Sequence, residues 1–258
     1  RSPRLHGYWL SEHGIDGAYL PLAVRPEKFE EALRALPILG FAGCNLTIPH
    51  KEAAIDLLTE VSPLAARIGA INTVSVTEDG ALRGDNTDAF GFLENLRAQA
   101  PDFNPAAGPA VVLGAGGAAR AVCAGLIDAG VEEIRLLNRT KARAESVAEN
   151  LGSALRTGEW PSRGAALKGA ALLVNTTSLG MTGQPALDLD LSLLPVHAVV
   201  NDLVYSPLMT ALLSGARGRG NIIVDGLGML LHQARPGFSA WFGVEPAVTP
   251  ELRDFVVG

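Results

Sequence analysis

Apolar and polar positions follow a regular alternation from residue 110 onward. Short apolar runs suit buried strands, and the amphipathic stretches between them suit helices that cover a sheet. The expected strands are 110–113, 133–137, 171–174, 197–200 and 222–224. The expected helices are 117–129, 140–150, 208–213 and 227–241, with a short one from Thr249-Pro250. Strands that alternate with helices predict a doubly wound α/β sheet of parallel strands.

The first hundred residues carry a similar but less regular pattern. We expect Ser2 to cap a first helix, with Pro3 at its first position and Gly14 at its end. Further helices are expected over 26–36, 49–58, 62–68 and 88–100, strands over 18–24, 41–46 and 71–76, and a polar turn over 84–87. This alternation predicts a second, smaller α/β unit with a mainly parallel sheet.

A loop over 101–109, rich in proline, glycine and alanine, suggests that a domain boundary lies nearby. We therefore expect two α/β domains. The first comprises 1–86 and is joined by the C-terminal helices of 236–258. The second comprises 87–235 and has a Rossmann-type fold.

Composition narrows the classes of partner. The net charge of −6 and the lack of a long basic run argue against nucleic acid or an anionic membrane. No apolar run approaches the roughly 20 residues of a membrane-spanning helix, and no signal peptide is visible.

Cys44 and Cys123 lie far apart, as in a reduced cytoplasmic protein. The chain opens at Arg1 in mid-pattern, so we expect a preceding segment. We predict no metal site, and the oligomeric state stays open, a homodimer included.

The run from Val111 to Leu113 leads into a glycine turn that is followed at once by helix-forming residues. This order places a pyrophosphate on a helix N-terminus. Gly114 would make the tight turn, Gly116 would let the backbone approach the phosphates, and Ala119 would allow close helix packing. The candidate dinucleotide residues are Gly114, Ala115, Gly116, Gly117, Ala118 and Ala119. An ordinary strand-to-helix turn is the alternative.

The end of the next strand indicates which dinucleotide binds. NAD-binding units carry an Asp or Glu there for the ribose hydroxyl, whereas this chain has Asn138, Arg139 and Thr140. The Arg139 guanidinium suits a phosphate, and Lys141 and Arg143 add positive charge. The pattern favours NADP, with a solvated basic helix start as the alternative.

Two further motifs carry candidate catalytic groups. Lys51 ends N-L-T-I-P-H-K in the first turn of an expected helix, where the helix dipole and burial would lower the pKa of its amine. Asp88 ends G-D-N-T-D in the first turn of another helix, where the dipole favours a carboxylate. A solvent-exposed lysine and simple capping by Thr87 and Asp88 are the alternatives. His50 is a rival proton carrier or a packed neighbour.

The ordered set of motifs resembles the shikimate dehydrogenase family. The matching stretches span nearly the whole chain: S-P at 2–3, N-L-T-I-P-H-K at 45–51, A-I-N-T-V at 70–74, G-D-N-T-D at 84–88, G-A-G-G-A-A-R at 114–120, N-R-T-K-A-R at 138–143, N-T-T-S-L-G-M at 175–181, N-D-L-V-Y at 201–205 and D-G-L-G-M-L-L-H-Q-A at 225–234. The family places a first strand and another serine just ahead of the position of Ser2, and neither is in this chain.

The resemblance implies a reaction and a pair of catalytic residues. The reaction is reversible hydride transfer between NADPH and the C3 carbonyl of 3-dehydroshikimate, a step toward aromatic amino acids. Lys51 and Asp88 occupy the positions of the family's catalytic pair, in a cleft where they would face the nicotinamide. Lys51 would carry the proton, with Asp88 orienting it, or a charged Lys51 would stabilise the developing alkoxide.

The resemblance also implies contacts to both small molecules. Those to the substrate, a small polyol carboxylate, are Ser2, Thr47, Asn72, Asp88, Tyr205 and Gln233. Those to the dinucleotide add Thr176, Leu203, Gly226 and Met229. Two rival functions stay open. One is a quinate/shikimate dehydrogenase of broader specificity that uses NADP or NAD, and the other is a non-catalytic NADP sensor.

Overall fold

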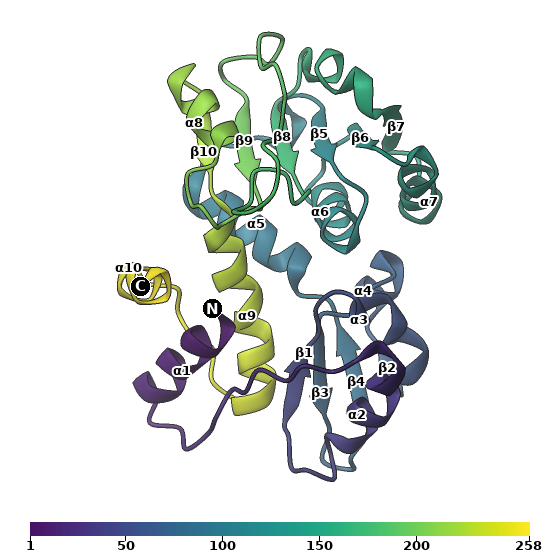
Figure 1. Ribbon diagram of the computed structural model, residues 1–258, viewed down its shortest axis with the longest axis vertical. Coiled ribbons are helices and arrows are strands. Elements are labelled where there is room, and N and C mark those ends of the chain that lie inside the picture. The colour runs from purple at the N-terminus through teal and green to yellow at the C-terminus, as the bar shows by residue number, and fades with distance from the viewer. The chain divides into compact units, whose positions relative to one another are not determined.

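The computed structural model describes residues 1–258 and divides them into two compact units. Unit 1 comprises Arg1–Thr87 and Leu231–Gly258, and unit 2 comprises Asp88–Leu230. The chain passes between them where α5 (Asp88–Gln99) begins and again within α9 (Gly226–Phe242) (Figure 1). Each unit is described by itself below.

The sheet of unit 2 has six strands, and all neighbouring strands are parallel. The strands are β5 (Ala110–Leu113), β6 (Ile134–Asn138), β7 (Leu155–Glu159), β8 (Leu172–Asn175), β9 (Val199–Asp202) and β10 (Ile222–Val224). Their order is β10-β9-β8-β5-β6-β7, which is the doubly wound order of dinucleotide-binding domains. The strand order reverses between β5 and β8, so the crevice for a ligand is expected at the carboxyl ends of these two strands.

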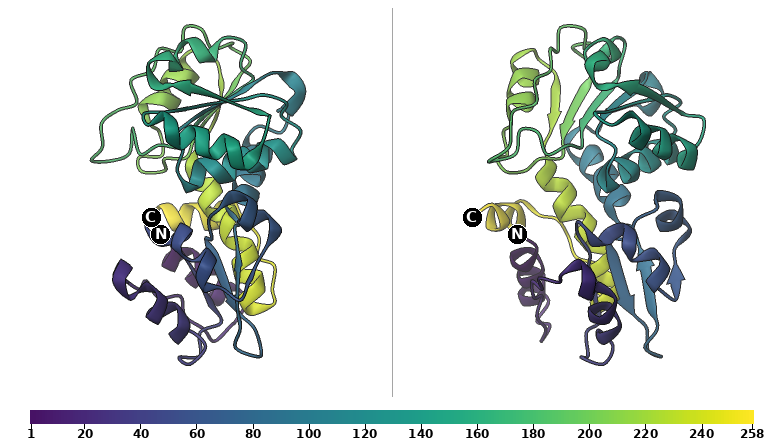
Figure 2. Two further views of the ribbon diagram at one scale, coloured as in Figure 1. Left: turned by 90° about the vertical axis from the view of Figure 1, so that its right-hand side faces the viewer. Right: turned by 45° about the vertical axis from the view of Figure 1, so that its right-hand side comes forward.

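Both faces of this sheet are covered by helices, because successive strand residues point to opposite sides. Val112 of β5 belongs to one core with residues of α5, α6 and α7. Val111 and Leu113 belong to a second core with residues of α8. The helices are α6 (Gly117–Asp128), α7 (Lys141–Leu151) and α8 (Ala211–Gly218). Figure 2 turns the ribbon so that this layering can be followed. The prediction of a doubly wound α/β sheet is confirmed.

Two sequence predictions for unit 2 are wrong. No strand was predicted over 155–159, where β7 pairs with β6. Its sequence, L-R-T-G-E, is polar and carries no apolar run, since an edge strand needs little burial. The helix expected at 208–213 begins only at Ala211, because the Thr210 hydroxyl caps it by accepting from the Leu213 amide at 3.3 Å.

The sheet of unit 1 has four strands in the order β1-β3-β4-β2. They are β1 (Gly43–Asn45), β2 (Glu60–Val61), β3 (Thr73–Val76) and β4 (Leu82–Asp85). The prediction of a mainly parallel sheet is wrong. β3 pairs antiparallel with both β1 and β4, and only β2 and β4 are parallel.

A hairpin between β3 and β4 accounts for that error. The Thr77 amide donates to the Ala81 carbonyl at 2.9 Å, and Gly80 has φ +81. Asp79-Gly80 is a common hairpin signal, and only glycine takes such a φ readily. The turn expected over 84–87 is therefore displaced, and Gly84 and Asp85 end β4 instead.

Ala18–Val24 is not a strand, contrary to prediction. Residues 15–25 have no regular structure, and Leu20 and Leu22 are more than half exposed. Apolar character alone does not make a strand, because strand geometry depends on a hydrogen-bonding neighbour.

The helices of unit 1 are shorter than the pattern suggested. The stretch over 26–36 splits into η1 (Pro26–Lys28) and α2 (Phe29–Ala35), and that over 49–58 into α3 (His50–Ala53) and η2 (Ile55–Leu57). The Ser62 hydroxyl caps α4 (Pro63–Ile68). Residues of α2 and α4 pack with strand residues Val74 and Leu82 in one core.

The C-terminal part of α9 packs against the same sheet. The Trp241 indole donates to the Val74 carbonyl at 3.0 Å. A Cβ on Gly43 would stand 2.1 Å from the Trp241 Nε1 atom and from the Val74 oxygen. Gly43 is thus the residue that lets the indole reach the strand backbone.

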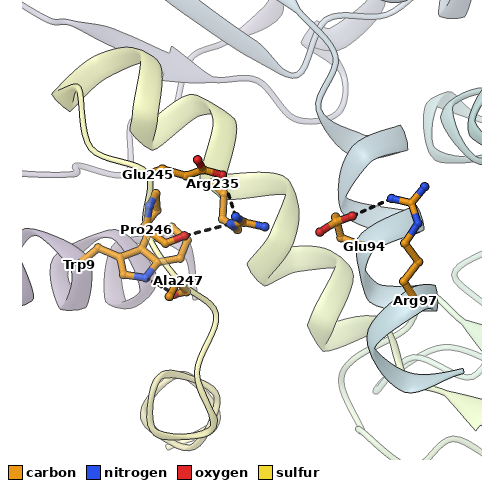
Figure 3. A network of polar contacts seen from close by, with 7 residues as sticks. All are labelled: Trp9, Glu94, Arg97, Arg235, Glu245, Pro246 and Ala247. Carbon is orange, nitrogen blue, oxygen red and sulfur yellow. Dashed lines mark hydrogen bonds and ion pairs between the residues drawn. The ribbon is translucent and has the colours of Figure 1, made fainter. Parts of the chain in front are cut away.

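Side-chain hydrogen bonds hold the segment after α9 in unit 1 (Figure 3). Trp9 of α1 (Ser2–Glu12) donates to the Ala247 carbonyl at 2.9 Å. Arg235 donates to the Pro246 carbonyl at 2.9 Å and pairs with Glu245 at 2.8 Å. The chain then ends in α10 (Pro250–Val257), capped by Thr249 as expected. No helix of the molecule has the length and apolarity to cross a membrane.

Candidate active site

The glycine turn after β5 is shaped by close backbone packing. Gly114 has φ +109, and its amide donates to the Leu137 carbonyl at 2.8 Å. A Cβ at this position would stand 2.5 Å from the Thr176 hydroxyl oxygen. Any larger residue would be strained in its backbone and would displace Thr176.

Gly116 has a different environment. It is exposed, it is the N-cap of α6, and a Cβ on it would meet nothing within 4 Å. No side chain caps α6, so its first amide donors and the positive end of its dipole are available to an anion. The open space and the uncapped amides fit the pyrophosphate of a dinucleotide. Ala119 is fully buried, as close helix packing requires.

The basic corner after β6 is exposed. The Asn138 amide donates to the Thr140 carbonyl at 2.8 Å, which shapes the turn into α7. Arg139 and Arg143 are exposed, and neither forms a salt bridge in the described chain. Lys141 differs, because it pairs with Glu145 at 3.6 Å. Two guanidinium groups are therefore presented to solvent where an NAD-binding domain carries an acid.

Other predicted dinucleotide residues lie at the carboxyl end of the same sheet. Thr176 follows β8, and its hydroxyl donates to the Leu113 carbonyl at 2.7 Å. Leu203 follows β9. Gly226 begins α9, and a Cβ on it would stand 2.2 Å from the Leu203 carbonyl oxygen. Met229 is buried and belongs to the same hydrophobic core as Ala115 of the glycine turn.

A buried carboxylate joins the ends of β8 and β9. Asp202 accepts from the Asn175 amide at 2.9 Å, the Val204 backbone amide at 3.1 Å and the Thr210 hydroxyl at 2.6 Å. Burial raises the pKa of Asp202, while these hydrogen bonds act in the opposite direction. The Thr177 hydroxyl adds a hydrogen bond to this network by donating to the Asn175 side-chain oxygen at 2.7 Å. This network fixes the loops that carry Thr176 and Tyr205.

Lys51 lies in unit 1, in a four-residue helix. The helix expected over 49–58 is broken after Ala53, so few aligned peptides contribute to a dipole at Lys51. Lys51 is half-buried, and its backbone carbonyl accepts from the Ile71 amide at 2.8 Å. The neighbouring His50 stacks on Phe29 with ring centroids 4.4 Å apart and contacts the Val24 carbonyl at 2.9 Å. His50 is thus a packed neighbour.

Asn72 is the centre of the polar cluster in unit 1. Its side-chain oxygen accepts from the Thr87 amide at 2.8 Å and from the Thr73 hydroxyl at 2.9 Å. Its side-chain nitrogen donates to the Thr87 hydroxyl at 3.0 Å and the Gln233 oxygen at 3.3 Å. The Leu46 amide donates to the Asn72 carbonyl at 2.8 Å.

These bonds gather predicted substrate residues from distant parts of the chain. Backbone pairing at Leu46 and Ile71 brings the segment with Thr47 and Lys51 beside Asn72, and Gln233 bonds to Asn72 directly. Thr47 is exposed. The Thr87 hydroxyl also donates to the Gln233 carbonyl at 2.7 Å. Three of the six predicted substrate residues, Thr47, Asn72 and Gln233, therefore lie together in unit 1.

Ser2 does not cap the first helix. Arg1 occupies the N-cap, and the first helical bond runs from the Leu5 amide to the Arg1 carbonyl at 3.0 Å. Ser2 is therefore inside the helix. Burial raises the pKa of the Tyr19 phenol to about 12, and the Ser2 side chain acts in the opposite direction. The capping alternative for Ser2 is wrong.

Asp88 and Tyr205 belong to unit 2. Asp88 is buried at the first position of α5, a twelve-residue helix whose dipole stabilises a carboxylate there. Its chain neighbour Thr87 is anchored to Asn72. Tyr205 is half-buried three residues beyond Asp202. The described chain holds no group of three or more His, Cys, Asp or Glu residues that could bind a metal.

Sequence reasoning missed several residues that shape the site. They are Tyr19, Asn45, Thr73, Asn175, Asp202 and Thr210. Asn175 and Asp202 had a usable signal, because each is a polar residue at the end of an apolar parallel strand. Tyr19 had none, since it lies in a segment without regular structure.

Two family models match the chain. One, described as the shikimate dehydrogenase substrate binding domain, matches residues 1–74. The other, described as shikimate / quinate 5-dehydrogenase, matches residues 99–179. Together they cover more than half of the chain.

Known proteins are similar over the whole length. A shikimate dehydrogenase (NADP(+)) from Paramagnetospirillum magneticum is 62% identical over 257 residues, covering 100% of this chain and 93% of the relative. The crystal structure of a Thermus thermophilus shikimate 5-dehydrogenase in complex with NADP(H) and shikimate has a TM-score of 0.87 at 40% identity, covering 99% of this chain and 93% of that one. A Corynebacterium glutamicum quinate dehydrogenase in complex with NAD has a TM-score of 0.92 at 31% identity, with the same coverage.

Proposed function

The chain belongs to the shikimate dehydrogenase family, and from this premise we propose how its residues perform the reaction. The chain catalyses the reversible NADPH-dependent reduction of 3-dehydroshikimate to shikimate, in aromatic amino-acid biosynthesis. The observation that carries the assignment is full-length identity of 62% to an NADP-dependent enzyme, together with a doubly wound sheet whose glycine turn is open to a phosphate.

We assign the dinucleotide to unit 2 and the substrate to unit 1. The pyrophosphate is held by the α6 amides next to Gly114 and Gly116. Arg139 and Arg143, with Asn138 and Thr140, hold the 2′-phosphate, since guanidinium forks match phosphate oxygens. The nicotinamide supplies or accepts the hydride. The remaining contacts are Ala115, Gly117, Ala118, Ala119, Thr176, Leu203, Gly226 and Met229.

The substrate is selected by directional hydrogen bonds from hydroxyl, amide and carboxyl side chains. Ser2, Thr47, Asn72 and Gln233 contribute them from unit 1, and Asp88 and Tyr205 from unit 2. The Asn72 cluster supports this role, because its hydrogen bonds hold the Asn72 and Gln233 amides in one orientation before a ligand binds. Such preorganisation reduces the side-chain conformational entropy that is lost when the substrate binds.

Lys51 and Asp88 are assigned the proton transfer. Lys51 gives a proton to the C3 oxygen during reduction and removes it during oxidation, while Asp88 orients the amine and accepts a hydrogen bond from the substrate. If Lys51 stays charged throughout, it acts instead by stabilising the developing alkoxide. The half-buried position of Lys51 next to the Asn72 cluster supports either role.

A spectrophotometric assay tests the function and the role of Lys51. The change in NADPH absorbance is followed with shikimate and with quinate, each with NADP and NAD. We expect turnover with shikimate and NADP. Absence of turnover with every pair of substrate and dinucleotide would refute the proposed function. Lys51→Ala should lower kcat by about 100-fold or more with little change in shikimate binding, as loss of a general acid predicts. Weaker shikimate binding at an unchanged kcat would mean that Lys51 binds the ground-state substrate and does not transfer the proton.

Broader specificity is a second candidate. One relative of the same fold is named a quinate dehydrogenase and was crystallised with NAD. Quinate and shikimate differ in few groups, and a site discriminates strongly only where buried polar groups would be left unpaired. Comparable kcat/KM for the two substrates would establish the broader activity. The exposed Arg139 favours NADP in either case.

A cytoplasmic location and a homodimer complete the proposal. Both cysteines are free, and burial raises the pKa of each thiol to about 12, as suits a protein that needs no disulfide. Cell fractionation and light scattering test the location and the number of copies.

A further inference from the structure

Tyr19 lies where the α1 helix meets the polar cluster of unit 1. Ser2 and His6 are four residues apart on α1, so they share one face of the helix. His6 stacks on the Tyr19 ring with centroids 4.1 Å apart and planes within 4°. The Ser2 side chain on this face lowers the pKa of the phenol, against the larger effect of burial. The α1 helix therefore holds the ring of Tyr19.

The hydroxyl of Tyr19 makes a hydrogen bond that determines the orientation of Asn45. It donates to the Asn45 side-chain oxygen at 2.9 Å. The Asn45 nitrogen donates to the Asn72 carbonyl and to the Thr73 hydroxyl, each at 3.2 Å. A carbonyl can only accept, so the nitrogen of Asn45 must face Asn72, and its oxygen needs a donor on the other side. Tyr19 supplies that donor.

The orientation passes on to Asn72. Because the Thr73 hydroxyl accepts from Asn45, its own proton is directed to the Asn72 side-chain oxygen at 2.9 Å. The chain of donors thus runs from Tyr19 through Asn45 and Thr73 to Asn72. Tyr19 is thus the first donor of a chain that ends at the predicted substrate residue Asn72.

The supporting residue His6 has an unusual environment. It is fully buried, and neither ring nitrogen has a hydrogen-bond partner. Buried polar atoms are rarely unpaired, because the loss of hydration is not recovered. The contribution of His6 therefore comes from the packing of its ring, whose flat face lies on Tyr19.

We propose that Tyr19 is a positioning residue of the substrate site, which sets the geometry of Asn72 through its hydroxyl and Asn45. The ligand class is a small hydroxylated ring carboxylate. The inference rests on the function proposed above. Tyr19 acts through its neighbours and contributes to substrate recognition rather than to hydride or proton transfer.

The test is Tyr19→Phe, which removes one oxygen and keeps the stacked ring. We expect the KM for shikimate to rise about tenfold, with kcat within about twofold and the KM for NADP unchanged, since one oriented hydrogen bond is lost. Tyr8→Phe is the matched control, because Tyr8 on the same helix packs on Phe255 with ring centroids 5.3 Å apart. It should behave as the wild type.

A double-mutant cycle with Asn45→Ala separates positioning from a general loss of stability. If Tyr19 acts through Asn45, the double variant has the same KM as Asn45→Ala alone. A KM for Tyr19→Phe equal to that of the wild type, or effects of the two substitutions that multiply, would overturn the proposal. Absence of turnover in the wild-type enzyme would instead refute the proposed function, so the two failures are distinguishable.

Discussion

The hydroxyl oxygen of Thr176 stands 2.5 Å from the point where a Cβ on Gly114 would be, so Thr176 leaves no room for a side chain at position 114. The bond of that hydroxyl to the Leu113 carbonyl at 2.7 Å holds Thr176 in place. The glycine turn is thus constrained by its neighbour on β8 as well as by its own backbone.

Gly114→Ala should lower the free energy of unfolding by about 3 kcal/mol, because φ +109 strains any side chain and the methyl group meets Thr176. Chemical denaturation measures this. Gly116→Ala is the matched control, since its methyl group meets nothing, and it should cost less than about 1 kcal/mol. Both substitutions should weaken NADP binding. Equal stability of the two variants would contradict the role of Thr176.

Arg139→Ala should raise the KM for NADP by roughly 10- to 100-fold, because hydrogen bonds between charged groups are lost. Activity with NAD should stay at its low level, since NAD has no 2′-phosphate. Lys141→Ala is the comparison, because Lys141 already pairs with Glu145, and its effect should be smaller. Steady-state kinetics with both dinucleotides distinguish the outcomes. An equal loss with NADP and NAD would exclude recognition of the 2′-phosphate by Arg139.

Asp202→Ala should destabilise the protein by about 3 kcal/mol, because three buried donors lose their acceptor. Asp202→Asn retains the shape and one acceptor oxygen, so a loss of about 1 kcal/mol is expected. Thermal unfolding compares the two variants. If the alanine variant were as stable as the asparagine variant, the network would contribute little to the loops after β8 and β9.

His6→Phe should change how stability depends on pH. Burial lowers the pKa of His6 from 6.5 to about 3, so the folded state keeps the ring neutral at mildly acidic pH. Below pH 6.5 the unfolded chain binds a proton that the folded chain does not, and stability is lost as pH falls toward 3. The phenylalanine variant lacks this loss.

The difference between wild type and His6→Phe should grow by about 2 kcal/mol between pH 6.5 and 4.5, in urea unfolding at each pH. The exposed His197 offers a comparison, and His197→Phe shows whether the effect belongs to the buried ring. Parallel stability curves for wild type and His6→Phe would mean that the ring is hydrated in solution.

Local chemistry made the cofactor half of this protein predictable. Strand, glycine turn and helix around Gly114 lie within thirteen residues, and the absence of an acid at Arg139 needs no knowledge of distant contacts. Parallel strands buried on both faces are continuous apolar runs, which is why β5, β8 and β9 could be recognised. The edge strand β7 was missed because it lacks such a run.

The substrate half depended on tertiary structure. The segment over 18–24 looks like a strand, but strand formation requires a partner that the pattern does not reveal. Ser2 looked like a cap, yet Arg1 takes the N-cap position and Ser2 lies inside the helix. The hydrogen bonds that join Asn72 to Gln233, and Tyr19 to Asn45, connect residues 161 and 26 positions apart. The sequence by itself thus determined the local turns and the residue types that the chemistry requires. Only the folded chain decided which donor faces which acceptor, because hydrogen-bond direction depends on distance and angle between segments that are remote in sequence.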